Sequence, residues 1–168
     1  MPPKIIERDA VICGNYRYLL RRVWDHDRPR ALFVMLNPSM ADAQIDDATI
    51  RSCFRLCVDW GYGSFEVVNL FGWRATDPAE LASVADPIGP DNDLIVVMAI
   101  HRCHTVICAW GANPFAVGRD HEMAALIKRH RPETYCLGMT QVGAPKHPLY
   151  IKTGTKLLAY PMARRAGA

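Results

Sequence analysis

Three polar residues, Asn37, Asn69 and His147, each follow an apolar segment of the chain and have side chains that could do chemistry. An asparagine offers both a hydrogen-bond donor and an acceptor, which suits the polar edge of a nucleobase, although it cannot act as a general base. An imidazole can stabilise a developing oxyanion. Each residue also has an ordinary structural interpretation, because asparagine often hydrogen-bonds a turn and a loop histidine is often exposed.

Carboxylates and cations lie close to these residues in the sequence. Asp42, Asp46 and Asp47 follow the first asparagine. One of them is expected to cap a helix, with Asp47 as the leading candidate, and another could orient or deprotonate a water or oppose a developing positive charge on a sugar. Arg74 and Thr76, downstream of the second asparagine, are candidate phosphate contacts.

Several common catalytic and metal-binding patterns are absent from the sequence. There is no P-loop, GxGxxG, GxSxG or HExxH pattern, so the sequence marks of nucleotide triphosphate hydrolysis, dinucleotide binding and zinc proteolysis are missing. The six cysteines include no CxxC pair and are interpreted as reduced core thiols. One group of possible zinc ligands has a spacing that matches none of the usual zinc patterns: His101, Cys103, His104 and Cys108. We therefore expect no metal and no cofactor.

Four apolar runs precede the polar residues and predict buried strands. A continuous apolar run, rather than an alternation, is typical of a strand covered on both faces. The runs span residues 32–37, 65–70, 105–109 and 134–137. The first run ends at Asn37-Pro38-Ser39, where Pro38 removes a backbone donor and ends the strand pairing. The third run leads into Trp110, and a loop containing His147 follows the fourth.

Helical segments alternate with these strands. A helix is predicted from the aspartate cap to Gly61, and others over residues 91–100 and 115–130, whereas residues 16–24 predict an edge strand or hairpin arm. This order predicts an α/β fold in a single domain of residues 1–168: a three-layer α/β/α sandwich with a central, mainly parallel four-stranded sheet and an N-terminal edge strand or hairpin. Because parallel strands present their carboxyl ends at one edge of a sheet, the polar residues that follow them should converge there. These residues are Asn37, Asn69, Trp110 and His147.

The net charge of +3 hides an uneven distribution along the chain. Residues 1–30 hold seven Lys and Arg against four Asp and Glu, residues 31–127 hold five against twelve, and residues 128–168 hold eight against one. Two basic ends that meet in space would form a positive face for a polyanion such as DNA. For the cations of residues 128–131 we favour a simpler role, which is to complement a helix C-terminus. The other C-terminal cations are candidate phosphate contacts: Lys146, Lys152, Lys156, Arg164 and Arg165.

Membrane insertion and secretion are not expected. No apolar run approaches the ~20 residues that span a bilayer. The N-terminus contains no apolar segment of a secretory signal, so we expect a cytoplasmic protein.

The chain resembles a bacterial and phage family known only as a domain of unknown function. The likeness covers about residues 15–152, and four segments show it: Met35-Leu36-Asn37-Pro38-Ser39, Val68-Asn69-Leu70-Phe71, Ala109-Trp110-Gly111 and His147-Pro148-Leu149-Tyr150.

A more distant resemblance, to the uracil-DNA glycosylase superfamily, implies a mechanism. The mismatch-specific branch has a similar Asn-Pro turn whose asparagine positions the attacking water, which would give that role to Asn37. Other branches recognise the base with an asparagine at the end of a middle strand, as Asn69 would here. Their HPS loop supplies a histidine that stabilises the leaving base and a neighbouring side chain that enters the duplex. His147 and Leu149 occupy the matching positions.

The chain also departs from that superfamily. Ser39 stands where a glycine usually follows the proline, and Leu149 replaces the serine of the HPS loop. The aspartate-containing first motif of the most active branch and the four-cysteine cluster of another branch have no counterpart. These differences favour a larger, modified or damaged base over uracil.

The predicted function is that of a nucleobase N-glycosylase that acts on a base flipped out of DNA. Catalysis would use Asn37, His147 and one of the three aspartates. Substrate contacts would come from Pro38, Ser39, Asn69, Phe71, Arg74, Trp110 and Leu149. Two alternatives remain open: a non-catalytic module that binds nucleic acid or a nucleotide, and an enzyme that acts on free nucleosides.

Overall fold

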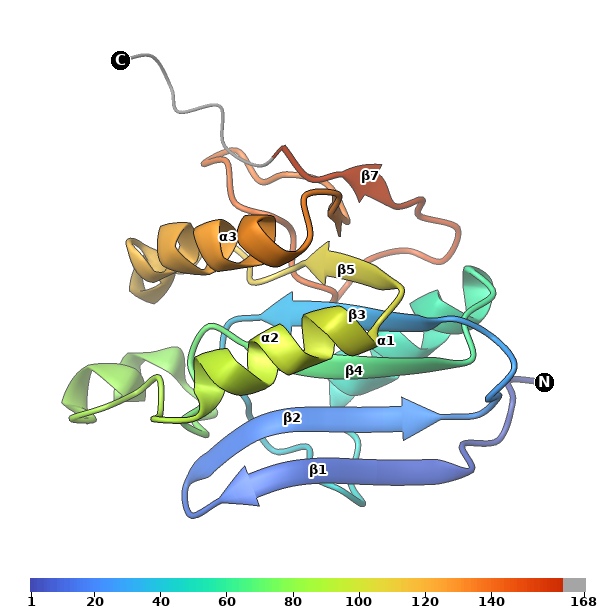
Figure 1. The fold of residues 1–168 in the computed structure, drawn as a ribbon, viewed down its shortest axis with the longest axis horizontal. Coiled ribbons are helices and arrows are strands. Elements are labelled where there is room, and N and C mark those ends of the chain that lie inside the picture. The colour runs from blue at the N-terminus through green and yellow to red at the C-terminus, as the bar shows by residue number, and fades with distance from the viewer. Residues whose placement is uncertain (162–168) are drawn as a thin grey trace.

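The strands of the protein form one mixed sheet. The computed structural model describes residues 1–161, whose strands are β1 (Glu7–Cys13), β2 (Tyr16–Val23), β3 (Arg30–Met35), β4 (Ser64–Asn69), β5 (Thr105–Cys108), β6 (Tyr135–Cys136) and β7 (Leu158–Ala159). Their order across the sheet is β1-β2-β4-β3-β5-β6-β7 (Figure 1). β3 pairs in parallel with β4 and β5, and β5 pairs in parallel with β6. The β1–β2, β2–β4 and β6–β7 pairs are antiparallel.

The α/β class is confirmed, but the sheet has seven strands, more than the four central strands and the N-terminal edge strand or hairpin of the prediction. The four predicted central strands correspond to β3, β4, β5 and β6, the strand predicted over residues 16–24 corresponds to β2, and the described residues add β1 and β7. Of the two alternatives predicted for residues 16–24, β2 is a hairpin arm and not an edge strand, because β1 pairs antiparallel with its outer side. β1 begins with three charged residues, 7–9, and β7 has only two residues, both exposed. Neither segment has the apolar pattern that predicts a strand.

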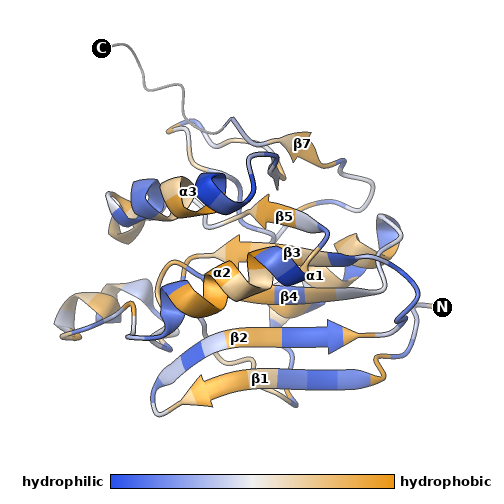
Figure 2. Cartoon of the chain, in the orientation of Figure 1, coloured by the Kyte–Doolittle hydropathy of each residue, from blue (hydrophilic) through white to orange (hydrophobic). Residues whose placement is uncertain are grey.

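Helices cover both faces of the sheet (Figure 1). The helices are α1 (Ala48–Asp59), α2 (Asn92–Arg102) and α3 (Arg119–His130), with short 3-10 turns η1 (Pro78–Ser83) and η2 (Pro114–Ala116). Leu56 of α1 packs with Phe33 and Phe65 on one face, while Ile100 of α2 and Ile127 of α3 pack on the other. Figure 2 shows the matching pattern, in which β3 and β5 are apolar along most of their length. No helix within residues 1–161 has the length and hydropathy to cross a membrane.

A buried ion-pair network lies toward the amino ends of the parallel strands. Glu66 of β4 is fully buried, and Arg102 at the end of α2 donates from Nε and Nη2 to its two oxygens at 2.8 and 2.7 Å. Arg30, the first residue of β3, donates from Nη1 to Glu66 Oε1 at 3.2 Å. The hydrogen bond to Glu66 raises the pKa of Arg102. Both carboxylate oxygens are therefore paired, and the network ties α2 to two strands.

Candidate functional site

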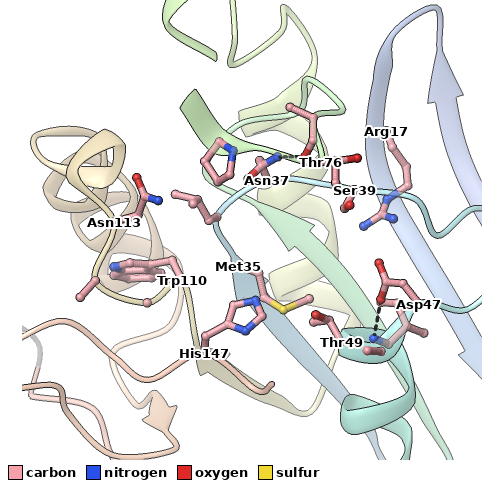
Figure 3. Close-up of a pocket in the computed structure, with 17 residues that line it drawn as sticks. Arg17, Met35, Asn37, Ser39, Asp47, Thr49, Thr76, Trp110, Asn113 and His147 are labelled. Carbon is pink, nitrogen blue, oxygen red and sulfur yellow. Dashed lines mark hydrogen bonds between the residues drawn. The ribbon is translucent and has the colours of Figure 1, made fainter. Parts of the chain in front are cut away.

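A cavity of about 480 Å³ opens at the carboxyl ends of β3 and β5 (Figure 3). Open parallel sheets commonly bind their ligands at this edge. Segments far apart in the sequence contribute its polar lining: β2, the turn after β3, the start of α1, the loop after β4, the loop after β5 and the segment after β6. These six segments contribute, in the same order, Arg17, Asn37, Thr49, Thr76, Trp110 and His147.

Asn37 presents a free acceptor to this cavity. Its Nδ2 donates to the carbonyl oxygens of Ala75 at 2.8 Å and Pro38 at 3.0 Å. Because both partners are acceptors, the side-chain nitrogen must face them, and the orientation of the amide is fixed. Oδ1 receives no hydrogen bond from any group within residues 1–161. Asn37 is thus held rigidly by the backbone, with an oxygen available to accept from a water or a base.

His147 is held in one tautomer. Its Nδ1 accepts a hydrogen bond from the backbone N–H of Leu149 at 3.2 Å, so the neutral ring has its proton on Nε2. Burial lowers the pKa of His147 below its ordinary value, and the nearby charge of Asp47 opposes that shift. The ring lies in the middle of the cavity lining, beside Met35 (Figure 3). Near neutral pH, His147 is therefore a neutral N–H donor.

Asp47 serves two purposes at the start of α1. As predicted, it is the N-cap: its Oδ1 accepts from the backbone N–H of Ile50 at 2.9 Å. It also lines the cavity, together with Thr49 in the first turn of the helix. Within the described part of the chain, Asp47 Oδ2 accepts no hydrogen bond. One carboxylate oxygen is thus used for folding and the other is free for chemistry.

The other two aspartates do not line the cavity. Asp42 Oδ1 accepts from the backbone N–H groups of Gln44 and Ile45 at 2.7 and 2.8 Å, and these bonds lower the pKa of Asp42. Asp46 pairs with Arg22 at 2.8 Å and with Arg8 at 3.0 Å. Both carboxylates hold the loop before α1 in place, so of the three predicted candidates only Asp47 reaches the cavity.

Arg17 is a member of the site that the sequence did not predict. It is 2% exposed, and its Nη1 donates to the carbonyl of Ala41 at 2.7 Å. Its Nε has no hydrogen-bond partner within residues 1–161. Burial lowers the pKa of Arg17 to about 10, so the guanidinium remains charged at neutral pH. The cavity therefore contains a buried fixed cation.

A β-bulge explains why Arg17 faces the cavity. In the β1–β2 pair, Val11 lies opposite Leu19 and Ile12 lies opposite Arg17, which leaves Tyr18 as the extra residue of β2. A bulge breaks the alternation of side chains and re-aims those beyond it. The alternation in the sequence predicted a half-exposed strand, whereas Arg17 is buried and lines the cavity. A single sequence contains no clear signal for such a bulge.

The loops after β5 and β6 form a further wall. Trp110 lines the cavity, and its buried Nε1 has no hydrogen-bond partner in the described chain. Asn113 also lines it, and Asn113 Oδ1 accepts from the N–H of Phe115 at 2.9 Å. Gly111 has φ of 76°, and a Cβ there would lie 3.4 Å from the Cβ of His147. Glycine thus lets the Trp110 loop approach His147 in a conformation that other residues rarely adopt.

Several predicted substrate contacts lie outside the cavity lining. Asn69 is 1% exposed and pairs in register with Met35, and neither of its amide atoms has a partner within residues 1–161. Phe71 belongs to the core on the face that α2 covers. Pro38 is buried, and the nearest polar contact of the Arg74 side chain is a long one, from Nε to the Ser39 carbonyl at 3.5 Å. Ser39 itself is in the lining.

The predicted phosphate-binding lysines are not brought together. Leu149 and Lys152 line a second hollow next to the cavity, whereas Lys146 and Lys156 are exposed and line neither. The candidates Arg164 and Arg165 lie outside the described residues. Among residues 1–161, no group of three or more His, Cys, Asp or Glu side chains is arranged to hold a metal ion.

The chain was compared with known proteins. A family model described as "Protein of unknown function (DUF1643)" matches residues 17–149, close to the span over which the sequence resembles a family of unknown function. Searches of curated proteins and of solved structures gave no match. The resemblance to the uracil-DNA glycosylase superfamily therefore stays a prediction.

Proposed function

This chain belongs to the DUF1643 family, whose function is unknown, and we propose that it is a nucleobase N-glycosylase that acts on DNA. In this proposal the parallel strands β4, β3, β5 and β6, with helices on both faces, are the three-layer sandwich of the uracil-DNA glycosylase superfamily. Three consecutive parallel strand pairs support it.

The observation behind the proposal is that Asn37, Asp47 and His147 line one cavity with a free acceptor, a free carboxylate oxygen and a neutral N–H donor. A flipped base would enter this cavity. The bond between sugar C1′ and the base nitrogen breaks, and its electron pair leaves with the base. Water forms the new bond to C1′, and its proton passes to Asp47 and finally to the base. The overall reaction is hydrolysis of the glycosidic bond.

Each group has a defined part in that reaction. Asn37 Oδ1 accepts a hydrogen bond from the attacking water and holds it in place. Asp47 opposes the positive charge that develops on the sugar ring. His147 donates from Nε2 to the departing base anion, and the buried cation of Arg17 adds fixed positive charge.

Base recognition requires a change from the role that the resemblance implies. Asn69 would recognise the base in that scheme, but it is not among the residues that line the cavity. We assign this role to Asn113. Its Oδ1 caps η2, and its Nδ2 has no hydrogen-bond partner within residues 1–161. Trp110 supplies an aromatic wall beside it.

The decisive experiment measures abasic sites formed by the protein on oligonucleotides that contain alkylated, oxidised or deaminated bases. Asn37→Ala should lower the rate of base release about 10²-fold or more, as is typical for loss of one positioned polar group. Asn15→Ala, which changes an exposed asparagine in the β1–β2 turn, is the matched control and should leave the rate unchanged. Base release at the wild-type rate by Asn37→Ala would contradict the mechanism. Absence of base release from every substrate would contradict the function.

A second candidate is a module that binds a nucleotide without cleaving it. The buried Arg17 favours it, because a guanidinium with a free N–H is a good phosphate partner. It predicts saturable binding of a nucleotide that Arg17→Met weakens, with no release of the base.

A further inference from the structure

A second hollow, of about 550 Å³, lies beside the cavity between α1 and the segment 149–153. Ala48 lines both hollows, so they adjoin at the start of α1. The lining of the second hollow includes the cations Arg51, Arg55 and Lys152 and contains no carboxylate. We call this second hollow the basic groove.

The two arginines of the basic groove are oriented by the backbone. Arg51 and Arg55 lie one turn apart on the exposed face of α1. Arg51 Nη1 donates to the carbonyl of Asp46 at 2.8 Å, and Arg55 Nη2 donates to the carbonyl of Ile151 at 2.7 Å. Each guanidinium uses one of its N–H groups in this way and keeps others for a ligand.

Of the carboxylates at the two ends of α1, two are engaged elsewhere and the third, Asp47, lies in the cavity lining. Asp46 is paired with Arg22 and Arg8, and Asp59 accepts from the N–H of Gly154 at 2.9 Å. The charges of the groove arginines are thus not cancelled by ion pairs within residues 1–161. A groove with several cations and no lining carboxylate is complementary to a chain of phosphates.

Tyr150 gives the groove an aromatic edge. It is the one non-glycine residue with a positive φ, 68°, in the part of the chain that the structure describes, and it is 90% exposed. A bulky residue in this conformation costs energy and needs an explanation, which is often functional. Leu149, by contrast, is half-buried, and its N–H is used by His147. The chain therefore turns an aromatic ring outward three residues after a cavity residue.

We propose that the basic groove binds one DNA strand, with phosphates on Arg51, Arg55 and Lys152 and a base stacked on Tyr150. Aromatic rings bind bases of any sequence because every base has a π-face. The next nucleotide along the strand would then enter the cavity past Ala48. This inference rests on the proposed function for the identity of the polyanion, and it gives Tyr150 the contact that the resemblance implies for Leu149.

The test uses the full chain and a fluorescently labelled 12-nucleotide single strand of unmodified bases, with Kd measured by anisotropy at several salt concentrations. Arg51→Gln combined with Arg55→Gln should weaken binding and reduce the slope of log K against log [salt] by about 1.4, since each lost phosphate contact removes about 0.7. Arg129→Gln, on the exposed surface of α3, is the control and should change neither quantity. Thermal unfolding checks that each variant is folded. An unchanged Kd and slope in the double variant would overturn the proposal.

Tyr150 is tested separately. Tyr150→Ala should weaken binding about tenfold without changing the salt slope, because stacking is not ionic. Tyr150→Phe keeps the ring and should bind as the wild type does. Equal binding by the alanine variant would overturn the stacking role. Competition by polyglutamate as strong as that by unlabelled DNA would overturn the assignment to a polynucleotide.

The outcomes separate this inference from the proposed function. Groove-dependent strand binding without base release on any modified substrate supports the groove and contradicts the glycosylase. Base release, together with a Kd that is the same for the wild type and the groove variants, supports the glycosylase and contradicts the groove.

Discussion

The two ends of the parallel strands differ in how their buried charged groups are paired. Toward the amino ends, both oxygens of the buried Glu66 are paired with arginines. At the carboxyl ends, the buried Arg17 has no hydrogen-bond partner for its Nε among the described residues. Other buried atoms without partners occur toward both ends: Arg21 Nε and Thr134 Oγ1 toward the amino ends, and the amide atoms of Asn69 and Trp110 Nε1 toward the carboxyl ends. A buried polar group without a partner costs about 1–3 kcal/mol. Glu66 is therefore fully paired, which favours stability, whereas Arg17, which lines the cavity, keeps an unpaired N–H of the kind that a ligand can satisfy.

The largest expected effect on stability is at the amino end. Glu66→Ala should lower the free energy of unfolding by about 2–3 kcal/mol, because it leaves two arginines without their anion. The side chains of Arg30 and Arg102 are 21% and 36% exposed, so water reaches them and keeps the loss below that of a fully buried pair. Urea denaturation measures the change.

The control for that variant is Asp9→Ala, which removes the exposed partner of Arg21. It should cost less than about 1 kcal/mol. Equal losses in both variants would remove the distinction between a buried structural network and a surface ion pair.

At the carboxyl end, stability and function should separate. Arg17→Met should change the free energy of unfolding by less than about 1 kcal/mol, because an apolar side chain of similar length replaces a buried cation whose hydrogen bonding is incomplete. Under the proposed function the same variant should lower base release at least about tenfold. Denaturation curves measure the free energy of unfolding, and abasic-site assays on the same preparation measure base release. A loss of stability as large as that of Glu66→Ala would mean that Arg17 is structural, and the contrast between the two ends would fail.

The smallest expected effect is the pH dependence from His147. Its pKa in the folded protein should lie below the ordinary value of 6.5, because burial disfavours the charged ring. The unfolded chain then binds more protons than the folded one as pH falls through 6.5, so His147 lowers stability at acid pH. NMR titration gives the pKa, with His147→Gln to assign the signal. A pKa at or above 6.5 would contradict the neutral donor role. The free energy of unfolding of His147→Gln should fall less than that of the wild type between pH 7.5 and pH 5.

Local patterns in the sequence were sufficient for much of the site. The apolar residues 33–36 followed by Asn37-Pro38 predicted a buried strand that ends at a polar turn, and Asp47 was predicted to cap the next helix. The alternation of strands and helices predicted that the polar residues at the ends of β3, β4, β5 and β6 meet at one edge. Asn37, Trp110 and His147 line a cavity there, whereas Asn69 does not. These features depend on neighbours in the chain, so they can be recognised without tertiary contacts.

Other features depend on contacts between distant segments. The role of each aspartate was set by its partners, since Asp46 is paired with Arg22 of β2 and lies outside the cavity lining. Arg17 reaches the cavity because a bulge opposite β1 re-aims it, and β1 itself has too polar a start to be predicted. The amino-acid sequence thus determined the strands, the helices and the edge at which polar residues gather, because period and turn chemistry are local. Which of those residues face the cavity was decided by strand pairing and burial, which exist only in the folded protein.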